Sequence, residues 1–376
     1  MTQVDYLVIG AGMSGASVAY ELAAHGTVAV LEAESAPGYH STGRSAALYT
    51  RNYGPPVVQR INAASHRFFV EPPPGFADQA LLRRRGALTV AAPGDEALLD
   101  PVLALAGPGN AIERVDAARA VAMASLLRPE LVGAAAFEPG VMDMDVAAIH
   151  QGYLRGMKRR GATLVCDARV ARIERRAGLW HVEAGSHAAS ARIVVNAAGA
   201  WADQVAHLAG VAPVGLVPKR RTAIIVEPPA AHAADLATMP AVDFAGADAY
   251  IKPDAGRIMA SPGDQSPVAP QDIQPEELDI AMLVDFLERR THLAVRRIAR
   301  SWAGLRSFVA DSCPVVGFDP LQPDFFWLAG QGGFGIMMAP ALSQAATTLI
   351  REGRVSRVLA DCGVGAEQLS PARLRR

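Results

Sequence analysis

The first apolar run of the chain, residues 4–9, has the short, nearly continuous hydrophobic pattern of a strand buried in a parallel sheet. Residues 10–15 form a glycine-rich turn. Residues 16–24 are good helix formers, with Gly26 at the position expected for a C-terminal cap. A second apolar run, residues 27–32, ends in an acid. The pattern predicts strand, turn, helix and strand, the start of a parallel sheet flanked by helices.

Three later segments extend this pattern. Residues 191–195 predict another short buried strand, which leads into a helix start at residues 196–199. Residues 168–173 alternate as a strand does. Residues 332–350 are apolar but are interrupted by Pro340 and several polar residues. A membrane-spanning helix needs about 20 mostly apolar residues, so this segment predicts a buried helix, and no transmembrane segment is expected.

The glycine spacing of the first turn indicates dinucleotide binding. Gly10 permits the tight turn, Gly12 lets the backbone approach a pyrophosphate, and Gly15 lets helix and strand pack closely. The helix N-terminus then offers free N–H groups to phosphates. Glu32 stands 22 residues after Gly10, near the spacing of the acid that binds ribose hydroxyls, and its charge disfavours a 2′-phosphate.

The loop after Glu32 bears on which dinucleotide is bound. Residues 33–47 contain turn formers, small hydroxyl residues, an arginine and closely spaced glycines. The chain does not lead directly from Glu32 into another β–α unit, and such a loop can wrap a large cofactor. The residues alone favour FAD over NAD but leave both open.

Composition narrows the class of protein. The chain has 376 residues, enough for two to three domains, and 36 Lys+Arg against 37 Asp+Glu give a net charge of -1. That balance argues against a nucleic-acid partner. Cys166, Cys313 and Cys362 are too far apart to predict a disulfide framework or a zinc cluster, so no metal is expected. The first residues lack the features of a signal peptide, so we expect a cytoplasmic protein, with peripheral membrane contact left open.

Several blocks of sequence resemble one family. The glycine turn, residues 38–47, residues 194–201 and residues 331–336 resemble the D-amino-acid oxidase/dehydrogenase superfamily. Within it the chain most resembles the bacterial D-arginine dehydrogenase type, through residues 150–156, 218–221, 252–256 and 302–308. These blocks occur in family order over nearly the whole chain.

The resemblance implies an α/β fold with non-covalent FAD. A Rossmann-like FAD-binding domain would comprise residues 1–80, 146–215 and 307–376, and a substrate domain on a mixed β-sheet would comprise residues 81–145 and 216–306. The predicted cofactor-binding residues are Gly10, Gly12, Ser14, Gly15, Glu32, Ser41, Thr42, Gly43, Arg44, Ser45, Ala46, Val170, Ala198, Gly199, Trp201, Gly332, Gly333, Gly335 and Ile336.

The resemblance also implies a chemistry. Oxidation of an amino acid at a flavin moves a hydride from Cα to N5, and the protein mainly orients the substrate. An arginine fork is the best match for the substrate carboxylate. Arg221 and Arg306 match the family's carboxylate-binding motifs, and Tyr53 and Tyr250 match its active-site tyrosines. Arg220 precedes Arg221 on a predicted strand, where neighbours face opposite ways, and the family match selects Arg221.

The chain departs from the D-arginine pattern at the substrate pocket. Ala87 stands where an acid would receive the guanidinium, Leu48 replaces a histidine, and Met337 replaces an amide near the glycine Gly333. These changes predict an apolar pocket and a preference for neutral, apolar D-amino acids over D-arginine. The basic run at residues 83–85 would instead favour an acidic substrate, but a solvated strand edge is its usual meaning.

The sequence therefore predicts FAD-dependent oxidative deamination of D-amino acids to imino acids, which hydrolyse to 2-oxo acids. The partners would be a small amino-acid substrate and an electron acceptor such as oxygen, a quinone or a dye-like molecule. Oxidation of secondary amines such as sarcosine, of glycine or of cyclic imino acids is an alternative. A non-enzymatic flavin-binding protein is a further one, disfavoured because Tyr53, Arg221, Tyr250 and Arg306 are all present.

Overall fold

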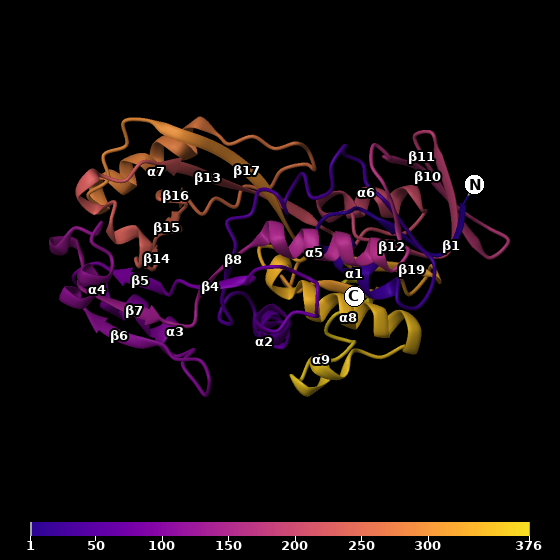
Figure 1. Ribbon diagram of the computed structural model, residues 1–376, viewed down its shortest axis with the longest axis horizontal. Coiled ribbons are helices and arrows are strands. Elements are labelled where there is room, and N and C mark those ends of the chain that lie inside the picture. Colours follow the sequence, from indigo (N-terminus) through magenta and orange to yellow (C-terminus); the bar gives the residue numbers. More distant parts are fainter. Residues whose placement is uncertain (1, 376) are drawn as a thin grey trace.

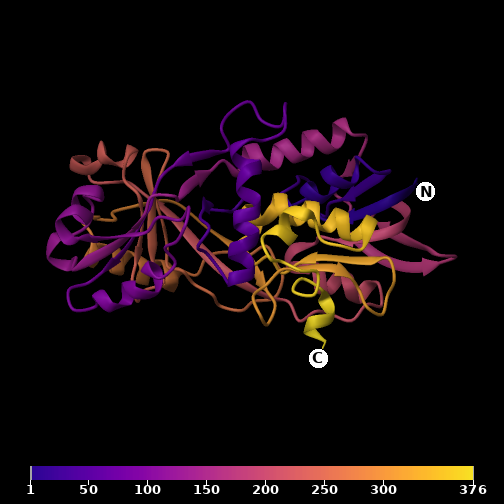
Figure 2. The ribbon, with the colours of Figure 1, turned by 90° about the horizontal axis from the view of Figure 1, so that it is seen from below.

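Two large β-sheets lie at opposite ends of an elongated molecule (Figures 1 and 2). The structure is a computed structural model that describes residues 2–375. Figure 1 shows β1 and β12 toward the end where the N-terminus lies, and β5, β7 and β13 toward the other end. The combination of helices with parallel and mixed sheets confirms the predicted α/β fold class.

The first sheet contains the predicted strand–turn–helix–strand unit. Its strand order is β10-β11-β12-β1-β2-β9, and β19 pairs with the last residues of β12 and with β18. The central strands are parallel, and all of β2 and the last three residues of both β1 and β12 are buried, which explains the apolar runs at these positions. The strands are β1 (Thr2–Ile9), β2 (Val28–Leu31), β9 (Thr163–Val165), β10 (Val170–Arg176), β11 (Leu179–Ala184), β12 (His187–Asn196), β18 (Val315–Phe318) and β19 (Phe325–Ala329).

Helices cover this sheet and complete its core. α1 packs on α5 and α8, and α2 also packs on α8. The helices are α1 (Met13–Leu22), α2 (Pro56–Val70), α5 (Val146–Arg159), α6 (Ala202–Leu208), α8 (Gly335–Glu352) and α9 (Arg357–Asp361). α8 is the predicted buried helix. The Ser343 hydroxyl donates to the Pro340 carbonyl at 3.0 Å and the Thr348 hydroxyl to the Gln344 carbonyl at 3.1 Å, which makes these two side chains compatible with burial. The buried Thr347 hydroxyl has no hydrogen-bond partner among the described residues.

The end of α1 differs from the prediction. The helix ends at Leu22 with Ala23 as its cap, in a right-handed conformation, rather than at Gly26. A Cβ atom at Gly26 would lie 2.9 Å from the Asp5 carboxylate. Gly26 is therefore required by the close approach of the chain to β1, which a cap pattern does not reveal.

The second sheet is mixed. Its order is β17-β13-β16-β15-β14-β5-β7-β6, and only the β14–β5 pair is parallel. One face packs on α4 (Ala117–Met123) and α7 (Glu277–Arg290) through a cluster that includes Leu88, Ile251 and Leu287. The strands are β5 (Ala87–Ala91), β6 (Glu113–Asp116), β7 (Ala134–Glu138), β13 (Val217–Val226), β14 (Ala241–Phe244), β15 (Tyr250–Asp254), β16 (Arg257–Ser261) and β17 (Ile298–Phe308).

A small sheet joins the two halves. It has the order β3-β8-β4, with β3 (Leu48–Tyr49), β4 (Leu82–Arg84) and β8 (Met142–Met144). The short helix α3 (Asp100–Leu103) is not part of this region and lies beside β6 and β7 of the second sheet (Figure 1). We propose that the chain divides at the bounds predicted from its sequence, with the second sheet as the substrate domain. None of the helices formed by residues 2–375 combines the length and hydropathy needed to cross a bilayer.

Candidate active site and cofactor cavity

A cavity of about 700 Å³ extends from the carboxyl ends of β1 and β2 to the inner face of the second sheet. At one end its wall contains Gly10 and Glu32, and at the other it contains Arg221 and Tyr250. Ligands of parallel α/β sheets bind outside the carboxyl ends of the strands. The cavity therefore joins the predicted dinucleotide site to the predicted substrate site.

The glycine turn shapes the first end of the cavity. Gly10 has a positive φ of 99°, and a Cβ atom on Gly15 would lie 1.8 Å from the Gly10 carbonyl oxygen. Gly10, Gly12 and Ser14 line the cavity, whereas Gly15 does not and instead lets α1 pack against the turn. The Met13 N–H donates to the Thr42 hydroxyl at 2.9 Å, which ties this turn to the following loop.

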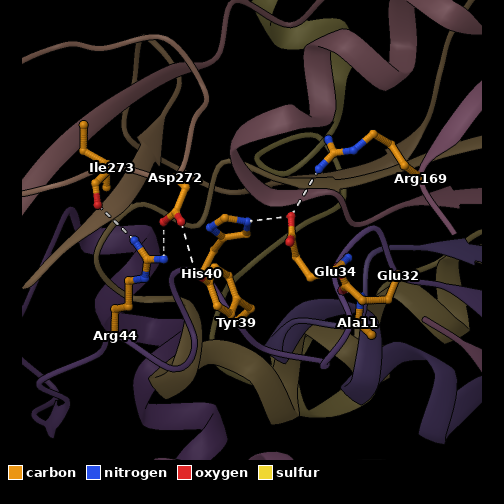
Figure 3. Close-up of polar contacts among 9 residues, drawn as sticks. All are labelled: Ala11, Glu32, Glu34, Tyr39, His40, Arg44, Arg169, Asp272 and Ile273. Carbon is orange, nitrogen blue, oxygen red and sulfur yellow. Dashed lines mark hydrogen bonds and ion pairs between the residues drawn. The ribbon is translucent and has the colours of Figure 1, made fainter. Parts of the chain in front are cut away.

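Glu32 lies in the cavity wall at the end of β2. Its carboxylate accepts hydrogen bonds from the Ala11 N–H at 2.7 Å and the Glu34 N–H at 3.0 Å. Figure 3 shows Glu32 beside Ala11, with Glu34 contacting His40 and Arg169. Those two contacts are 3.1 Å and 3.2 Å long. Sequence reasoning missed Glu34, His40 and Arg169 because no motif marks them.

The Arg44 guanidinium, predicted to bind the cofactor, is bonded to other residues of the protein. It forms an ion pair with Asp272 and donates to the Ile273 carbonyl at 3.0 Å (Figure 3). It also donates to the Ala303 carbonyl at 3.1 Å. The bond from Arg44 lowers the pKa of Asp272. Arg44 still lines the cavity, but these contacts use its guanidinium to hold the segment around Asp272.

The loop of residues 38–46 is also fastened to β17. The Ser41 hydroxyl donates to the Leu305 carbonyl at 2.6 Å, and the Trp302 indole donates to the Arg44 carbonyl at 2.9 Å. Gly43 does not line the cavity, because it forms a turn in which its N–H donates to Gly38 at 2.7 Å. The remaining predicted cofactor residues that line the cavity are Ser41, Thr42, Ser45, Ala46, Val170, Ala198, Gly199, Trp201, Gly332, Gly333, Gly335 and Ile336.

At the other end, Tyr53, Arg221, Tyr250 and Arg306 line one part of the cavity. The Arg306 guanidinium donates to the Tyr53 hydroxyl at 3.2 Å. Arg221 Nε is buried without a hydrogen-bond partner among the described residues. Burial and then the neighbouring Arg306 lower the pKa of Arg221. The pair therefore presents unneutralised positive charge to the cavity.

Arg220 has a different environment from Arg221. Its guanidinium contacts Asp264 at 3.2 Å, Glu276 at 2.7 Å and Asp279 at 2.8 Å. It is buried on the opposite side of β13, as the alternation of strand side chains requires. Arg220 is thus a structural ion-pair centre, and its charge is satisfied within the protein.

Gly333 brings the backbone close to Arg306. A Cβ atom on Gly333 would lie 3.2 Å from Arg306 Nη1. The Gly332 N–H donates to the Ser307 carbonyl at 2.9 Å, which attaches this loop to β17. A side chain at Gly333 would crowd the guanidinium.

The substrate end is less apolar than the sequence alone predicts. Leu48, Gly333 and Met337 line the cavity, but Ala87 does not. Asp243, on the neighbouring strand β14, lines it instead. Burial, and then the nearby Glu138, raise the pKa of Asp243 to about 6. In the sequence Asp243 is an acid within an otherwise apolar strand. This pattern indicates a site residue only when it is known which face of the strand points into the cavity.

The basic run at residues 83–85 lies away from this end. Arg83 and Arg84 are exposed, and Arg85 contacts Asp143 at 2.7 Å. None of the three lines the cavity. No group of three or more His, Cys, Asp or Glu side chains within residues 2–375 is arranged to hold a metal ion.

A βαβ glycine turn, an acid at the end of its second strand and a cavity that reaches an arginine-bearing sheet define a dinucleotide-binding protein. The family model described as "FAD dependent oxidoreductase" (DAO) matches residues 5–349. The chain belongs to this family, and FAD is its cofactor.

Curated relatives share part of this sequence. "FAD-dependent oxidoreductase domain-containing protein 1" of Xenopus laevis is 29% identical over 188 residues, which cover 45% of this chain. The matched region spans 36% of the length of that protein. The mouse protein of the same name is 24% identical over 95% of this chain and 83% of its own.

Solved structures share the whole fold. L-proline dehydrogenase from P. horikoshii superposes with a TM-score of 0.83 at 22% identity, covering 100% of this chain and 98% of its own. FAD-bound L-alpha-glycerophosphate oxidase from Mycoplasma pneumoniae has a TM-score of 0.81 at 18% identity, covering 93% and 95%. Iminodiacetate oxidase from Chelativorans sp. BNC1 has a TM-score of 0.79 at 22% identity, covering 97% and 98%. At identities of 18–22%, the similarity to these structures shows that the fold is shared and shows nothing further.

The residues present fit FAD. In the described chain α1 has neither a side-chain cap nor an acid in its first turn. The N–H groups and positive end of the helix are therefore available to phosphates, apart from the Met13 N–H. Glu32 presents its carboxylate in the wall where ribose hydroxyls would bind. A Cβ atom on Gly12 would lie 3.3 Å from the Thr42 hydroxyl and would narrow the cradle between them.

Proposed function

We propose that the protein oxidises D-amino acids to imino acids, which then hydrolyse in water to 2-oxo acids and ammonia. The observation that carries the proposal is the pair Arg221 and Arg306. Both guanidinium groups face the cavity, and no carboxylate among residues 2–375 lies within ion-pair distance of either. A substrate carboxylate would supply the missing counter-charge.

The tyrosines would complete the carboxylate site. Tyr53 accepts a hydrogen bond from Arg306, and its own hydroxyl hydrogen can then point toward a substrate oxygen. Tyr250 lines the same part of the cavity. Together these groups would hold the α-carbon in one orientation, which is the main contribution a protein makes to this chemistry.

Bound FAD would supply the hydride acceptor. The residues around the glycine turn and Glu32 would hold its dinucleotide part, and residues 332–336 would lie near its ring. A substrate amine that binds in its neutral form needs no strong general base in the protein. We propose that FAD is bound non-covalently, that the protein is cytoplasmic, and that oxygen, a quinone or a dye-like acceptor removes the electrons.

Within the family we place the chain near the bacterial D-arginine dehydrogenase type, on the strength of Tyr53, Arg221, Tyr250 and Arg306. An alternative is oxidation of a secondary amine, of glycine or of a cyclic imino acid. Two proteins of similar fold carry names of that kind, L-proline dehydrogenase and iminodiacetate oxidase. Two unneutralised arginines suit either substrate class, because D-amino acids, sarcosine, glycine and cyclic imino acids such as proline all carry a carboxylate.

An anaerobic reduction screen tests the proposal. The purified holoenzyme is mixed with D-amino acids, L-amino acids and N-methyl or cyclic amino acids, and bleaching of the flavin absorbance is followed. D-amino acids are expected to bleach it fastest. Faster bleaching by sarcosine or proline would favour the alternative, and no bleaching by any amine would indicate a non-enzymatic flavoprotein. Repeating the reaction with oxygen and with an artificial acceptor identifies the class of acceptor.

A further inference from the structure

Asp243 is a carboxyl group of the substrate end without a partner. It lines the cavity, and among residues 2–375 its side chain has no hydrogen bond and no ion pair. Asp243 is an exposed residue, and it lines the cavity. By contrast, Asp143 contacts both Arg85 and Lys252, at 2.7 Å and 3.4 Å.

The position of Asp243 on the sheet separates it from the arginine pair. Asp243 is directly opposite Tyr250 in the β14–β15 ladder, so the two side chains emerge on the same face. Two further strands, β16 and then β13, follow in the sheet, and β13 carries Arg221. Three strand spacings amount to about 14 Å across the sheet. The cavity therefore has a basic end and an acidic wall on one continuous surface.

Apolar and polar contacts surround the acidic wall. The Thr50 hydroxyl donates to Glu138 at 2.5 Å, and the Thr50 N–H donates to the Met337 sulfur at 3.5 Å. Glu138 is the nearby charge that contributes to the raised pKa of Asp243. Leu48 and Met337 both line the cavity, so an aliphatic chain can lie against them while its end reaches Asp243.

We propose that Asp243 determines substrate specificity by binding the terminal cationic group of a basic amino acid whose α-carboxylate lies on Arg221 and Arg306. This proposal rests on the proposed function and refines its substrate class. A carboxylate that lines a cavity without a hydrogen-bond partner or counter-ion favours a ligand that carries a cation. The ammonium or guanidinium of lysine, ornithine or arginine provides that partner, and the methylene groups of these substrates match the apolar wall.

The proposal replaces the predicted preference for neutral side chains. That preference assumed that the absence of an acid at position 87 left the pocket without one. Residue 241 of β14 pairs with Ala87, and Asp243 lies two positions farther along that strand. The acid is therefore supplied by the adjacent strand of the same sheet.

The first test compares substrates that differ only in the terminal charge. Anaerobic flavin reduction is measured for lysine and norleucine, each as both enantiomers, in wild-type holoenzyme, in Asp243→Asn and in Asp285→Asn. Asp285 is an exposed acid of α7 and serves as the matched control. The second-order rate for lysine is expected to exceed that for norleucine at least about tenfold in the wild type. Asp243→Asn is expected to lower only the lysine rate, by about 100-fold.

The second test measures binding without turnover. 6-Aminohexanoate and hexanoate retain the carboxylate and the chain but lack the α-amine, and each perturbs the flavin spectrum when it binds beside the ring. Tighter binding of 6-aminohexanoate in the wild type, lost in Asp243→Asn, supports the proposal even if no amine is oxidised. Flavin content and melting temperature of each variant show that it is folded.

Three results would overturn the proposal. Norleucine could outperform lysine in the wild type. Asp243→Asn could slow both substrates equally, which would mean that Asp243 acts on the shared α-amine. The lysine preference could vanish in Asp248→Asn, which alters another cavity acid, and persist in Asp243→Asn. If no amino acid bleaches the flavin but 6-aminohexanoate still binds through Asp243, the proposed function fails while the charge recognition holds.

Discussion

Arg306 Nη1 lies 3.2 Å from the Tyr53 hydroxyl, although the two residues are 253 positions apart in the chain. Tyr53 is on the loop that follows β3, and Arg306 is near the end of β17. Their contact brings a phenol and a guanidinium to the same part of the cavity. The predicted carboxylate site is thus assembled from both halves of the molecule.

Replacing Arg306 should strongly weaken substrate binding while FAD remains bound. Arg306→Met is expected to lower kcat/KM about 1,000-fold, because an enclosed charge–charge interaction is worth roughly 2–5 kcal/mol. Tyr53→Phe removes one hydroxyl and is expected to cost about tenfold. Steady-state kinetics with the best substrate measures both effects. Arg300→Met, on an exposed part of the same strand, is the control, and an equal loss in that variant would contradict the assignment.

Glu32→Gln should weaken FAD binding. The carboxylate accepts two backbone hydrogen bonds and faces the cavity, and hydrogen bonds to charged groups contribute about 1.5–3 kcal/mol. The dissociation constant of FAD from the apoprotein is expected to rise roughly 10- to 100-fold in a fluorescence titration. Glu183→Gln, in the exposed part of β11, should leave the dissociation constant unchanged. An unchanged dissociation constant in Glu32→Gln would show that Glu32 does not contribute to FAD binding.

Gly15→Ala should disrupt the glycine turn. The added Cβ would lie 1.8 Å from the Gly10 carbonyl oxygen, so α1 or the turn must move. Backbone overpacking of this kind costs about 3 kcal/mol, and for a chain of 376 residues the melting temperature is expected to fall by roughly 4 °C, with loss of FAD. Gly140→Ala, where the new Cβ meets no atom within 4 Å, should behave as the wild type. Normal flavin content in Gly15→Ala would show that the turn tolerates expansion.

The raised pKa of Asp243, about 6, predicts a pH-dependent stability. An unfolded aspartate titrates near 3.9, so the folded state binds the proton more tightly. The contribution of this group to stability is fully present below about pH 4 and is lost as pH rises through about 6. Asp243→Asn should therefore raise the melting temperature of the holoenzyme more at pH 7.5 than at pH 4.5. Asp285→Asn should show no such difference. An equal increase in melting temperature for Asp243→Asn at both pH values would contradict the raised pKa of Asp243.

The sequence by itself determined the dinucleotide half of the protein. The runs at residues 4–9 and 27–32 became β1 and β2, the glycines between them formed the turn, and Glu32 reached the cavity. These features are readable because each depends on residues close together in the chain. Burial on both faces requires a continuous apolar run, and a tight turn requires glycine.

Only the tertiary structure decided the chemistry of the substrate half. Ala87 and Asp243 are 156 positions apart, and their relation arises from the parallel pairing of β5 with β14. In the dinucleotide half, too, the tertiary structure decided the roles of two residues: Arg44 became the partner of Asp272, and Gly26 proved necessary for a close approach to β1. The physical reason is common to all three. A side chain's role depends on the neighbour that strand pairing and packing bring to it, and no local pattern specifies which neighbour that is.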